Sequence, residues 1–234
     1  MIMDFHSHIL PGIDDGSADV AQSIEMLRME AEQGVTHVVA TPHFYARHNT
    51  PEVFLQSRDA AEAALREEMK KHSGLPQIHI GAEVSFFRGM ADSEMLEQLV
   101  LRGTRYILIE MPMPPWNDTY YRELAAIWEK RNLTPIIAHI DRYIGPFRTR
   151  GIPERLEELP VLVQANGDFF LEGGTAAMAL RMLRRGQIHL LGSDCHNTRS
   201  RKPNLGDAIQ RITRKLGQEP LERIRECGQA VLDV

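Results

Sequence analysis

Short apolar segments alternate along the chain with longer segments in which apolar residues recur every three or four positions. The short segments predict parallel strands, because helices that cover both faces of a parallel sheet leave its strands wholly buried. Seven such strands are predicted, at residues 2–5, 37–41, 77–84, 105–111, 134–139, 160–167 and 188–194. The periodic segments predict helices: a first one that Ser17 opens and Gly34 closes, and others at residues 51–72, 118–131, 153–158, 174–185, 204–217 and 219–226.

Strands and helices alternate without interruption by a low-complexity segment, a repeat or a Gly/Ser-rich linker. This series predicts an α/β fold in which residues 1–234 form a single domain. Seven strand–helix units favour closure into a TIM-like barrel. A doubly wound open sheet is the alternative architecture.

Composition narrows the classes of partner. The 234 residues are 43% hydrophobic and 25% charged, as in ordinary soluble proteins, and the formal net charge is −5. This charge provides no basic surface, so nucleic acid is not expected as a partner. A membrane span needs about 18 consecutive apolar residues, and no apolar run in this sequence comes near that length. The N-terminus also lacks the pattern of a signal peptide. Two cysteines, Cys195 and Cys227, fit a reducing compartment, so we expect a cytoplasmic protein without membrane insertion.

Ionisable side chains gather where the predicted strands end. In a barrel these ends meet on one face, where such folds build their sites. The pairs His6/His8 and Asp194/His196 are each two residues apart, a spacing that points both side chains to the same side of a strand. Glu83 interrupts an apolar run, where an unpaired carboxylate is costly. Nine candidate metal ligands follow from this pattern: His6, His8, Asp15, His43, Glu83, Glu110, His139, Asp194 and His196.

The chemistry of these nine residues favours a site with several metal ions. Taken singly, a strand-end histidine is more often a rim residue, and Asp15 fits an ordinary turn. Taken together, the four carboxylates repel one another, and imidazoles with carboxylates suit Mn, Fe or Zn better than Ca. Three divalent ions would convert a charge of −4 to +2 and attract a phosphate dianion. The remaining histidines are expected to be structural or exposed: His37, His48, His72, His79 and His189.

The motifs that carry these residues are DFHSHILPGIDDG, TPH, GAE, the glutamate that ends the fourth predicted strand, AHIDRY and GSDCHN. In combination they resemble the PHP (polymerase and histidinol phosphatase) superfamily. More narrowly, the chain is similar to the metal-dependent protein-tyrosine phosphatases of bacterial capsule and exopolysaccharide loci. The resemblance spans residues 1 to about 205. It implies the PHP fold, a distorted (β/α)7 TIM-like barrel, with three divalent metal ions, most commonly Mn and otherwise Fe or Zn.

The resemblance also implies a role for each candidate. His6, His8, Glu83 and Asp194 would hold one ion, Glu83 would bridge to a second ion with Glu110 and His139, and Asp15, His43 and His196 would hold the third. Arg142 and Arg201 correspond to phosphate-binding arginines, and a guanidinium fork suits phosphate oxygens. One departure stands out, because His139-Ile140-Asp141-Arg142 replaces the usual His-Pro-Glu-Arg.

The function that the resemblance implies is hydrolysis of a phosphomonoester by a metal-activated hydroxide. The expected partner is a phosphotyrosine-bearing protein, the tail of a bacterial tyrosine kinase, and both a monomer and an oligomer stay open. A phenolate, with a pKa of about 10, leaves more readily than an alkoxide. Candidates for an aryl pocket are Phe44, Tyr45, Phe86, Phe87 and Trp116.

Three alternative functions remain. Histidinol-phosphate phosphatase, or another small-molecule phosphoesterase of the same superfamily, would use the same metal ligands. A cysteine phosphatase would use Cys195 with Arg201, which fit the spacing C-x5-R, but the intervening HNTRS has no glycine to form a phosphate loop. A non-catalytic binding protein is disfavoured by the complete set of ligands.

Overall fold

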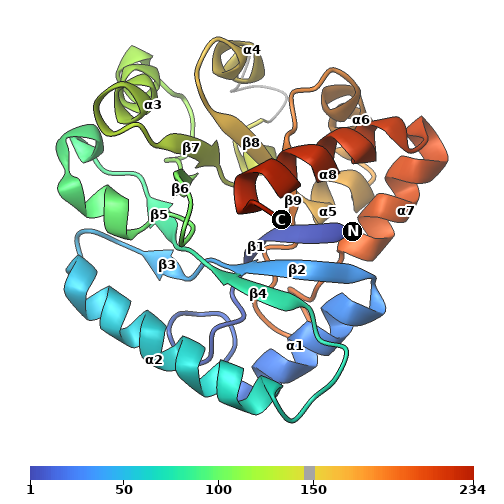
Figure 1. Ribbon diagram of the computed structural model, residues 1–234. Coiled ribbons are helices and arrows are strands. Elements are labelled where there is room, and N and C mark those ends of the chain that lie inside the picture. The colour runs from blue at the N-terminus through green and yellow to red at the C-terminus, as the bar shows by residue number, and fades with distance from the viewer. Residues whose placement is uncertain (145–150) are drawn as a thin grey trace.

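The computed structural model describes residues 1–144 and 151–234 (Figure 1). Within these residues the strands are β1 (Ile2–Ser7), β2 (Val35–Ala40), β3 (His43–Phe44), β4 (Gln77–Ile80), β5 (Glu83–Ser85), β6 (Tyr106–Glu110), β7 (Thr134–Ile137), β8 (Leu162–Asn166) and β9 (Leu190–Gly192). The α-helices are α1 (Val20–Glu32), α2 (Pro51–Met69), α3 (Asp118–Arg131), α4 (Ile152–Glu157), α5 (Gly167–Leu171), α6 (Ala176–Arg184), α7 (Leu205–Leu216) and α8 (Glu219–Leu232). Short 3-10 helices are η1 (Met90–Asp92), η2 (Glu94–Gln98) and η3 (Ile140–Arg142).

The strands pair in parallel in two groups. One sheet has the order β1-β2-β4, and the other has the order β3-β5-β6-β7-β8-β9. The chain passes from the first sheet to the second at Thr41-Pro42 and again at Gly81-Ala82. The predicted strand 37–41 corresponds to β2, which ends one residue earlier at Ala40. The predicted strand 77–84 is wrong as a single element, because it is divided into β4 and β5. β2 ends before Pro42, because proline has no N–H group to donate to a neighbouring strand. At the break between β4 and β5, the N–H of Gly81 donates to the carbonyl of Ala40 over 2.8 Å, and the N–H of Glu83 donates to the carbonyl of Pro42 over 3.0 Å.

The first strand meets the last one and curls the sheet. Ser7 forms a parallel bridge with Cys195. The N–H of His8 donates to the carbonyl of Cys195 over 2.9 Å, and the N–H of Asp194 donates to the carbonyl of His6 over 2.7 Å. Figure 1 shows helices around the outside of this curled parallel sheet. The α/β fold with a distorted (β/α)7 barrel, predicted from the sequence, is confirmed.

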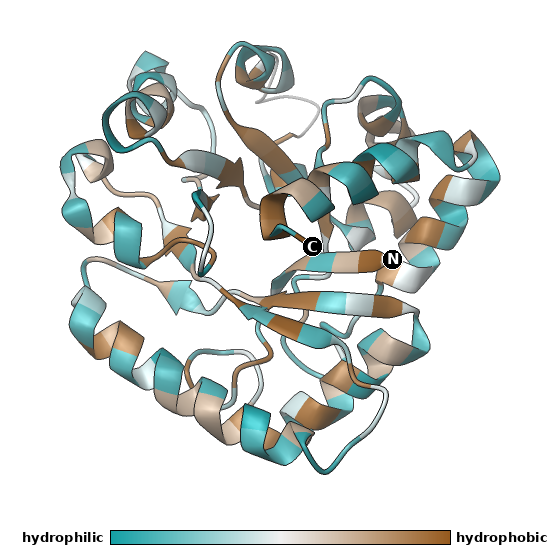
Figure 2. Cartoon of the chain, in the orientation of Figure 1, coloured by the Kyte–Doolittle hydropathy of each residue, from teal (hydrophilic) through white to brown (hydrophobic). Residues whose placement is uncertain are grey.

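A small apolar cluster fills the interior of the curled sheet. Met3, Phe5 and Leu190 are fully or almost fully buried in it. The last turn of α8 supplies Val231 and Leu232 to the same cluster. Gly228 allows this approach, because a Cβ atom there would lie 2.8 Å from Cε of Met3. Figure 2 shows hydrophobic positions along the strands and mainly hydrophilic positions on the outer faces of the helices.

Helix boundaries agree with the sequence pattern in part. The prediction for residues 118–131 is confirmed by α3, whose N-cap Asn117 accepts a hydrogen bond from the N–H of Thr119. The start at Ser17 was wrong, because Asp19 caps α1 by accepting from the N–H of Gln22 over 2.9 Å. Helix α8 extends beyond residue 226 to Leu232, and Gly167 begins α5 rather than ending a strand.

No helix within the described ranges combines the length and hydrophobicity that a membrane crossing requires.

Candidate metal centre

Glu83, at the start of β5, is the centre of the polar cluster. Its Oε2 atom lies 3.2 Å from Nε2 of His6, 3.4 Å from Nε2 of His8 and 2.9 Å from Nδ1 of His43. Its Oε1 atom lies 2.8 Å from Nε2 of His139. The carboxylate is 1% exposed, so it is a buried anion surrounded by imidazoles. Four of the predicted ligands therefore converge on the fifth.

The other four predicted ligands extend the same cluster. Oδ1 of Asp194 lies 3.6 Å from Nε2 of His6 and 3.5 Å from Nε2 of His8. Oδ1 of Asp15 lies 3.5 Å from the Nε2 atoms of both His43 and His196. Oε1 of Glu110 lies 3.7 Å from Nε2 of His139. The structure thus brings all nine side chains together in one cluster, and their role as ligands stays a prediction.

The atoms of the cluster fit divalent metal ions. Nδ1 of His6 donates to Oε1 of Gln164 over 3.3 Å, and Nδ1 of His8 donates to Oδ2 of Asp14 over 2.8 Å. Neutral rings with these hydrogens direct two bare Nε2 lone pairs, 3.2 Å apart, towards the carboxylate of Glu83. Positive charge at the centre, either a proton on one of these rings or a metal ion, relieves the repulsion between these acceptor atoms. Oε2 of Glu83 and Nε2 of His196 are moreover buried without a hydrogen-bond partner.

Three groups within the cluster have atoms close enough to share an ion: His8, Asp15, His43 and His196; His6, His8 and Asp194; and His43, Glu83 and Glu110. The first contains the third predicted ligand set, with His8 added. In the last, His43 takes the place expected for His139. Imidazole and carboxylate donors in these groups suit Mn, Fe or Zn.

Electrostatic coupling maintains opposite charges inside the cluster. Burial alone would raise the pKa of Glu83, but His6, His139 and His43 hold it well below its usual value. Burial would lower the pKa of His6, but Glu83 and Asp194 raise it overall. A metal ion that binds to a ring carrying this proton displaces it, so binding is linked to proton release. Burial and His8 lower the pKa of His196 to about 4, which leaves that ring neutral and ready to ligate at pH 7.

Both predicted phosphate-binding arginines lie at the edge of the cluster and contact Asp194. Nη2 of Arg142 donates to Oδ2 over 2.5 Å, and Nη2 of Arg201 donates to Oδ1 over 2.9 Å. Both side chains are more than one-third exposed, so they face solvent on one side and the buried cluster on the other. In the replaced Ile140-Asp141 pair, Ile140 is buried and Asp141 accepts from the N–H of Asn166 over 3.0 Å. Ile140 therefore anchors the segment that carries Arg142 by packing in the core, and Asp141 anchors it through this hydrogen bond.

Two of the predicted ligands have unusual backbone conformations. Among the described residues, four non-glycine residues have positive φ, and two of them, Asn132 and Asp233, are helix C-caps. The other two are His139 (φ 30°) and Asp194 (φ 53°). Such conformations are costly and persist where the surroundings enforce them, as at functional sites.

Asp14 is a functional candidate that sequence reasoning missed. Its Oδ2 accepts from Nδ1 of His8 over 2.8 Å and from the N–H of His43 over 3.0 Å. Burial would raise the pKa of Asp14, but the hydrogen bond from His8 is among the contacts that lower it to about 2. A carboxylate behind a ligating histidine fixes its tautomer, so the acidic pair Asp14-Asp15 was itself the signal.

Cys195 does not have the environment of a nucleophile. Its side chain is fully buried, and Sγ lies 3.8 Å from Oε1 of Glu30, away from the histidines. Burial, Glu30 and Asp4 raise the pKa of the thiol well above its ordinary value. A nucleophilic cysteine needs a lowered pKa and access to solvent, so the C-x5-R alternative conflicts with the structure.

An aromatic cavity of about 290 Å³ lies at the ends of β3 and β5. It is lined by Tyr45, Ala46, Arg47, His48, Ser85, Phe86 and Phe87. The ring of Tyr45 stacks on the ring of His43 with centroids 5.3 Å apart, so the cavity adjoins the metal centre. Two predicted pocket residues lie elsewhere: Phe44 is buried in the core, and Trp116 packs on Tyr121 and Tyr143.

Similarity to known proteins agrees with this geometry. Residues 2–232 match the family described as capsular polysaccharide synthesis, CpsB/CapC. Tyrosine-protein phosphatase YwqE of Bacillus subtilis is 31% identical over an alignment of 248 positions, which covers 99% of this chain and 91% of YwqE. Tyrosine-protein phosphatase CpsB of Streptococcus agalactiae serotype V is 26% identical, with 99% of this chain and 98% of CpsB covered.

Similarity to solved structures supports the fold. A crystal structure from a study of YwqE of Bacillus subtilis and CpsB of Streptococcus pneumoniae, described there as metal-dependent tyrosine phosphatases, superposes with a TM-score of 0.81. This match covers 99% of this chain and 94% of the solved chain at 24% identity. The family match over residues 2–232, together with the 31% identity to YwqE, establishes that the chain belongs to the CpsB/CapC family.

Proposed function

We propose that this protein is a metal-dependent phosphomonoester hydrolase that acts on phosphotyrosine. The observation that carries the proposal is the contact of Arg142 and Arg201 with Asp194, at the edge of a cluster of nine candidate metal ligands. The names of the relatives, tyrosine-protein phosphatases YwqE and CpsB, support the same activity. The proposed catalytic unit is one domain of residues 1–234.

The proposed metal ligands are His6, His8, Asp15, His43, Glu83, Glu110, His139, Asp194 and His196, which would hold three divalent ions, with Mn as the native metal. Bound ions of this kind lower the pKa of water and neutralise charge on a phosphoryl group. The guanidinium groups of Arg142 and Arg201 would bind the phosphoryl oxygens and orient the ester at the edge of the cluster. Asp14 would keep the Nδ1 hydrogen on His8, so that Nε2 stays available as a donor.

The aromatic cavity supports an aryl phosphate as the substrate. Tyr45, Phe86 and Phe87 offer apolar surface next to His43, where the ring of phosphotyrosine can lie. A phenolate with a pKa of about 10 needs less help to leave than an alkoxide. The proposed partner is the phosphotyrosine-bearing tail of a bacterial tyrosine kinase that controls capsule synthesis. Such a partner places the protein in the cytoplasm.

The test compares substrates and metals on one preparation of the full chain. Purified protein should contain two to three Mn, Fe or Zn ions and should hydrolyse p-nitrophenyl phosphate and a phosphotyrosine peptide. Chelation should abolish both activities, and added Mn²⁺ should restore them. Full activity after verified removal of metal would overturn the proposal. Hydrolysis of histidinol phosphate in preference to the phosphotyrosine peptide would replace the substrate while keeping the metal centre.

A further inference from the structure

Strand β8 lies between two strands that lead to predicted ligands, but it supplies none of the nine itself. It pairs with β7, which ends shortly before His139, and with β9, which ends shortly before Asp194. It carries instead two buried amides, Gln164 (0% exposed) and Asn166 (7% exposed). A buried amide is costly unless it is hydrogen-bonded, so both side chains need an explanation.

Gln164 contacts two predicted ligands with one oxygen atom. Its Oε1 accepts from the backbone N–H of His139 over 2.6 Å and from Nδ1 of His6 over 3.3 Å. The peptide donor identifies this atom as the oxygen, because an amide nitrogen cannot accept. The bond to His139 restrains a residue whose φ is 30°, and the bond to His6 places the imidazole hydrogen on Nδ1. Nε2 of His6 is thereby left as a donor atom for a metal ion.

Asn166 continues this network to a third ligand. Nε2 of Gln164 donates to Oδ1 of Asn166 over 3.0 Å, and Nδ2 of Asn166 donates to Oδ2 of Asp194 over 3.1 Å. The two amides, one strand period apart, therefore connect the ends of β7, β1 and β9. Gly192 leaves room for them, because a Cβ atom there would lie 2.6 Å from Nε2 of Gln164.

We propose that Gln164 and Asn166 are positioning residues, which hold His6, His139 and Asp194 in the orientation that binds metal. The inference rests on the metal centre of the proposed function and goes beyond it, since neither amide is a ligand. Removal of such supporting partners typically weakens metal affinity about 10- to 100-fold. A general role in core packing would instead affect folding alone.

The experiment measures Mn²⁺ binding to the full chain by calorimetry and the melting temperature with and without Mn²⁺. Gln164→Met, which keeps the bulk and loses the polar atoms, should bind Mn²⁺ about 10- to 100-fold more weakly and show a smaller rise in melting temperature on metal addition. Gln164→Glu, which keeps the oxygen that faces His139, should recover part of the affinity. The matched control is Gln187→Met, at a buried glutamine outside the cluster, which should bind Mn²⁺ like the wild type.

Wild-type Mn²⁺ affinity in Gln164→Met, or an equal fall in melting temperature with and without metal, would overturn the inference. If Gln164→Met does not fold, Mn²⁺ binding is measured on the smaller substitution Asn166→Ser. Weaker Mn²⁺ binding by this variant supports the inference, and unchanged binding rejects it. Failure of the proposed function is distinguishable, because a protein that binds Mn²⁺ normally but hydrolyses no aryl phosphate would refute the activity and leave the positioning role intact.

Discussion

Arg142 and Asp194 are in direct contact, with Nη2 of the arginine 2.5 Å from Oδ2 of the carboxylate. One residue is a candidate for binding phosphate and the other for binding metal. Burial would lower the pKa of Arg142, but Asp194, Glu83 and Glu110 raise it overall, so the guanidinium stays charged. The contact therefore links the group proposed to bind the phosphate to a group proposed to bind metal.

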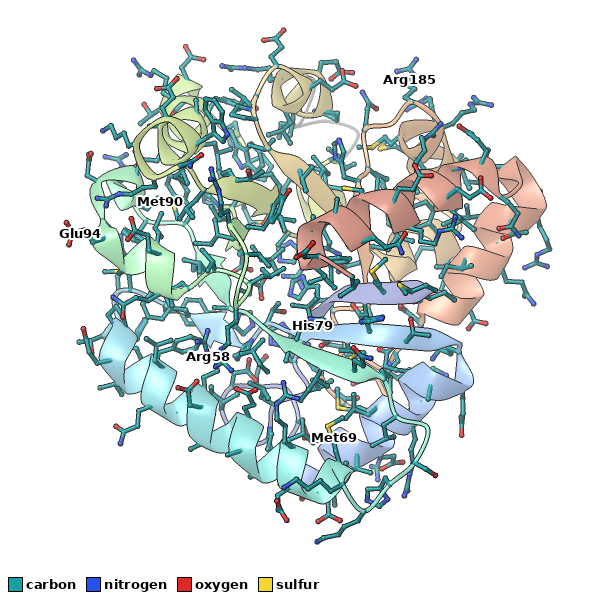
Figure 3. The ribbon with its side chains drawn as sticks, viewed as in Figure 1. Arg58, Met69, His79, Met90, Glu94 and Arg185 are labelled. Carbon is teal, nitrogen blue, oxygen red and sulfur yellow. The ribbon has the colours of Figure 1, made fainter. Side chains whose placement is uncertain are left out.

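Replacing either arginine should impair catalysis more than metal binding. Arg142→Ala and Arg201→Ala should each lower kcat/KM about 10- to 100-fold, which corresponds to roughly 1.5–3 kcal/mol for a charge-assisted contact. Manganese content should stay at the wild-type level. Without metal, both variants should melt at a lower temperature, because the buried Asp194 loses a counter-charge. Arg185→Ala is the control, since Arg185 projects away from the fold into solvent (Figure 3). Wild-type kinetics in both variants would remove the arginines from the site.

The hydroxide and thiolate mechanisms differ in the effect of Cys195→Ser. Because Cys195 is buried beside Glu30, we expect the variant to keep most of its activity, and we expect thiol alkylation to leave the wild type active. Asp194→Ala and His196→Ala should lose nearly all activity together with metal, as measured by elemental analysis. An inactive Cys195→Ser protein with a full metal complement would contradict the metal mechanism and leave the fold untouched.

Glu30 should make the stability of the protein depend on pH. Burial and the neighbouring Asp4 raise the pKa of Glu30 well above its usual value. Asp4 accepts from the N–H groups of His6 and Ser193, both over 2.9 Å, so Asp4 carries the charge and Glu30 the proton. At low pH the folded and unfolded states both hold this proton, and stability is unaffected. As pH rises above the unfolded pKa of 4.5, only the unfolded state ionises, so stability falls until the folded pKa is passed.

Glu30→Gln keeps a donor towards Asp4 and removes the titration. The free energy of unfolding of the variant, relative to the wild type, should therefore rise with pH by up to about 1.4 kcal/mol per pH unit above pH 4.5. Urea unfolding of both proteins between pH 5 and 8, with metal bound throughout, measures this difference. A difference that is constant over the whole range would show that Glu30 is ionised in the folded protein.

The aromatic cavity should discriminate between substrates. Phe87→Ala should raise KM for a phosphotyrosine peptide roughly 10-fold, as expected for a lost apolar contact, and leave the weak hydrolysis of a phosphoserine peptide unchanged. Trp128→Ala, at an aromatic residue that is 46% exposed, is the control and should affect neither substrate. Equal losses on both peptides would mean that the cavity does not hold the aryl ring.

Much of the site was predictable because its residues break the local pattern. Glu83 and Glu110 stand out as acids in apolar runs, and the candidates follow or end predicted strands, whose ends were expected to share one face. The same signal was present at Gln164 and Asn166, within the apolar run of β8. It was missed because an amide carries no charge and so fits a strand or a turn equally well. Only the distances to His139 and Asp194 reveal what the amides do.

The curl of the sheet was less predictable than its strands. The breaks after β2 and β4 depend on how Gly81 and Glu83 pair with a neighbouring strand, and such pairing is not a local property of the sequence. Arg58 of α2, which lies near β4 in Figure 3, donates to the carbonyl of Gly81 over 3.0 Å and fixes this break from outside. The predicted end of the last helix at residue 226 is too early, because Cys227, Val231 and Leu232 continue the three-to-four-residue spacing of its apolar side chains to the end of α8.

The seam between β1 and β9 has a consequence for how the chain folds. Asp4 and Ser193, which are hydrogen-bonded across it, are 189 positions apart in the sequence. Closing so long a loop is a slow step, because chain entropy opposes contacts between distant residues. The proposed metal centre includes His6 from one side of this seam and Asp194 from the other, so a half-folded chain would have no complete site. Metal uptake during refolding would therefore report the meeting of the first strand with the last.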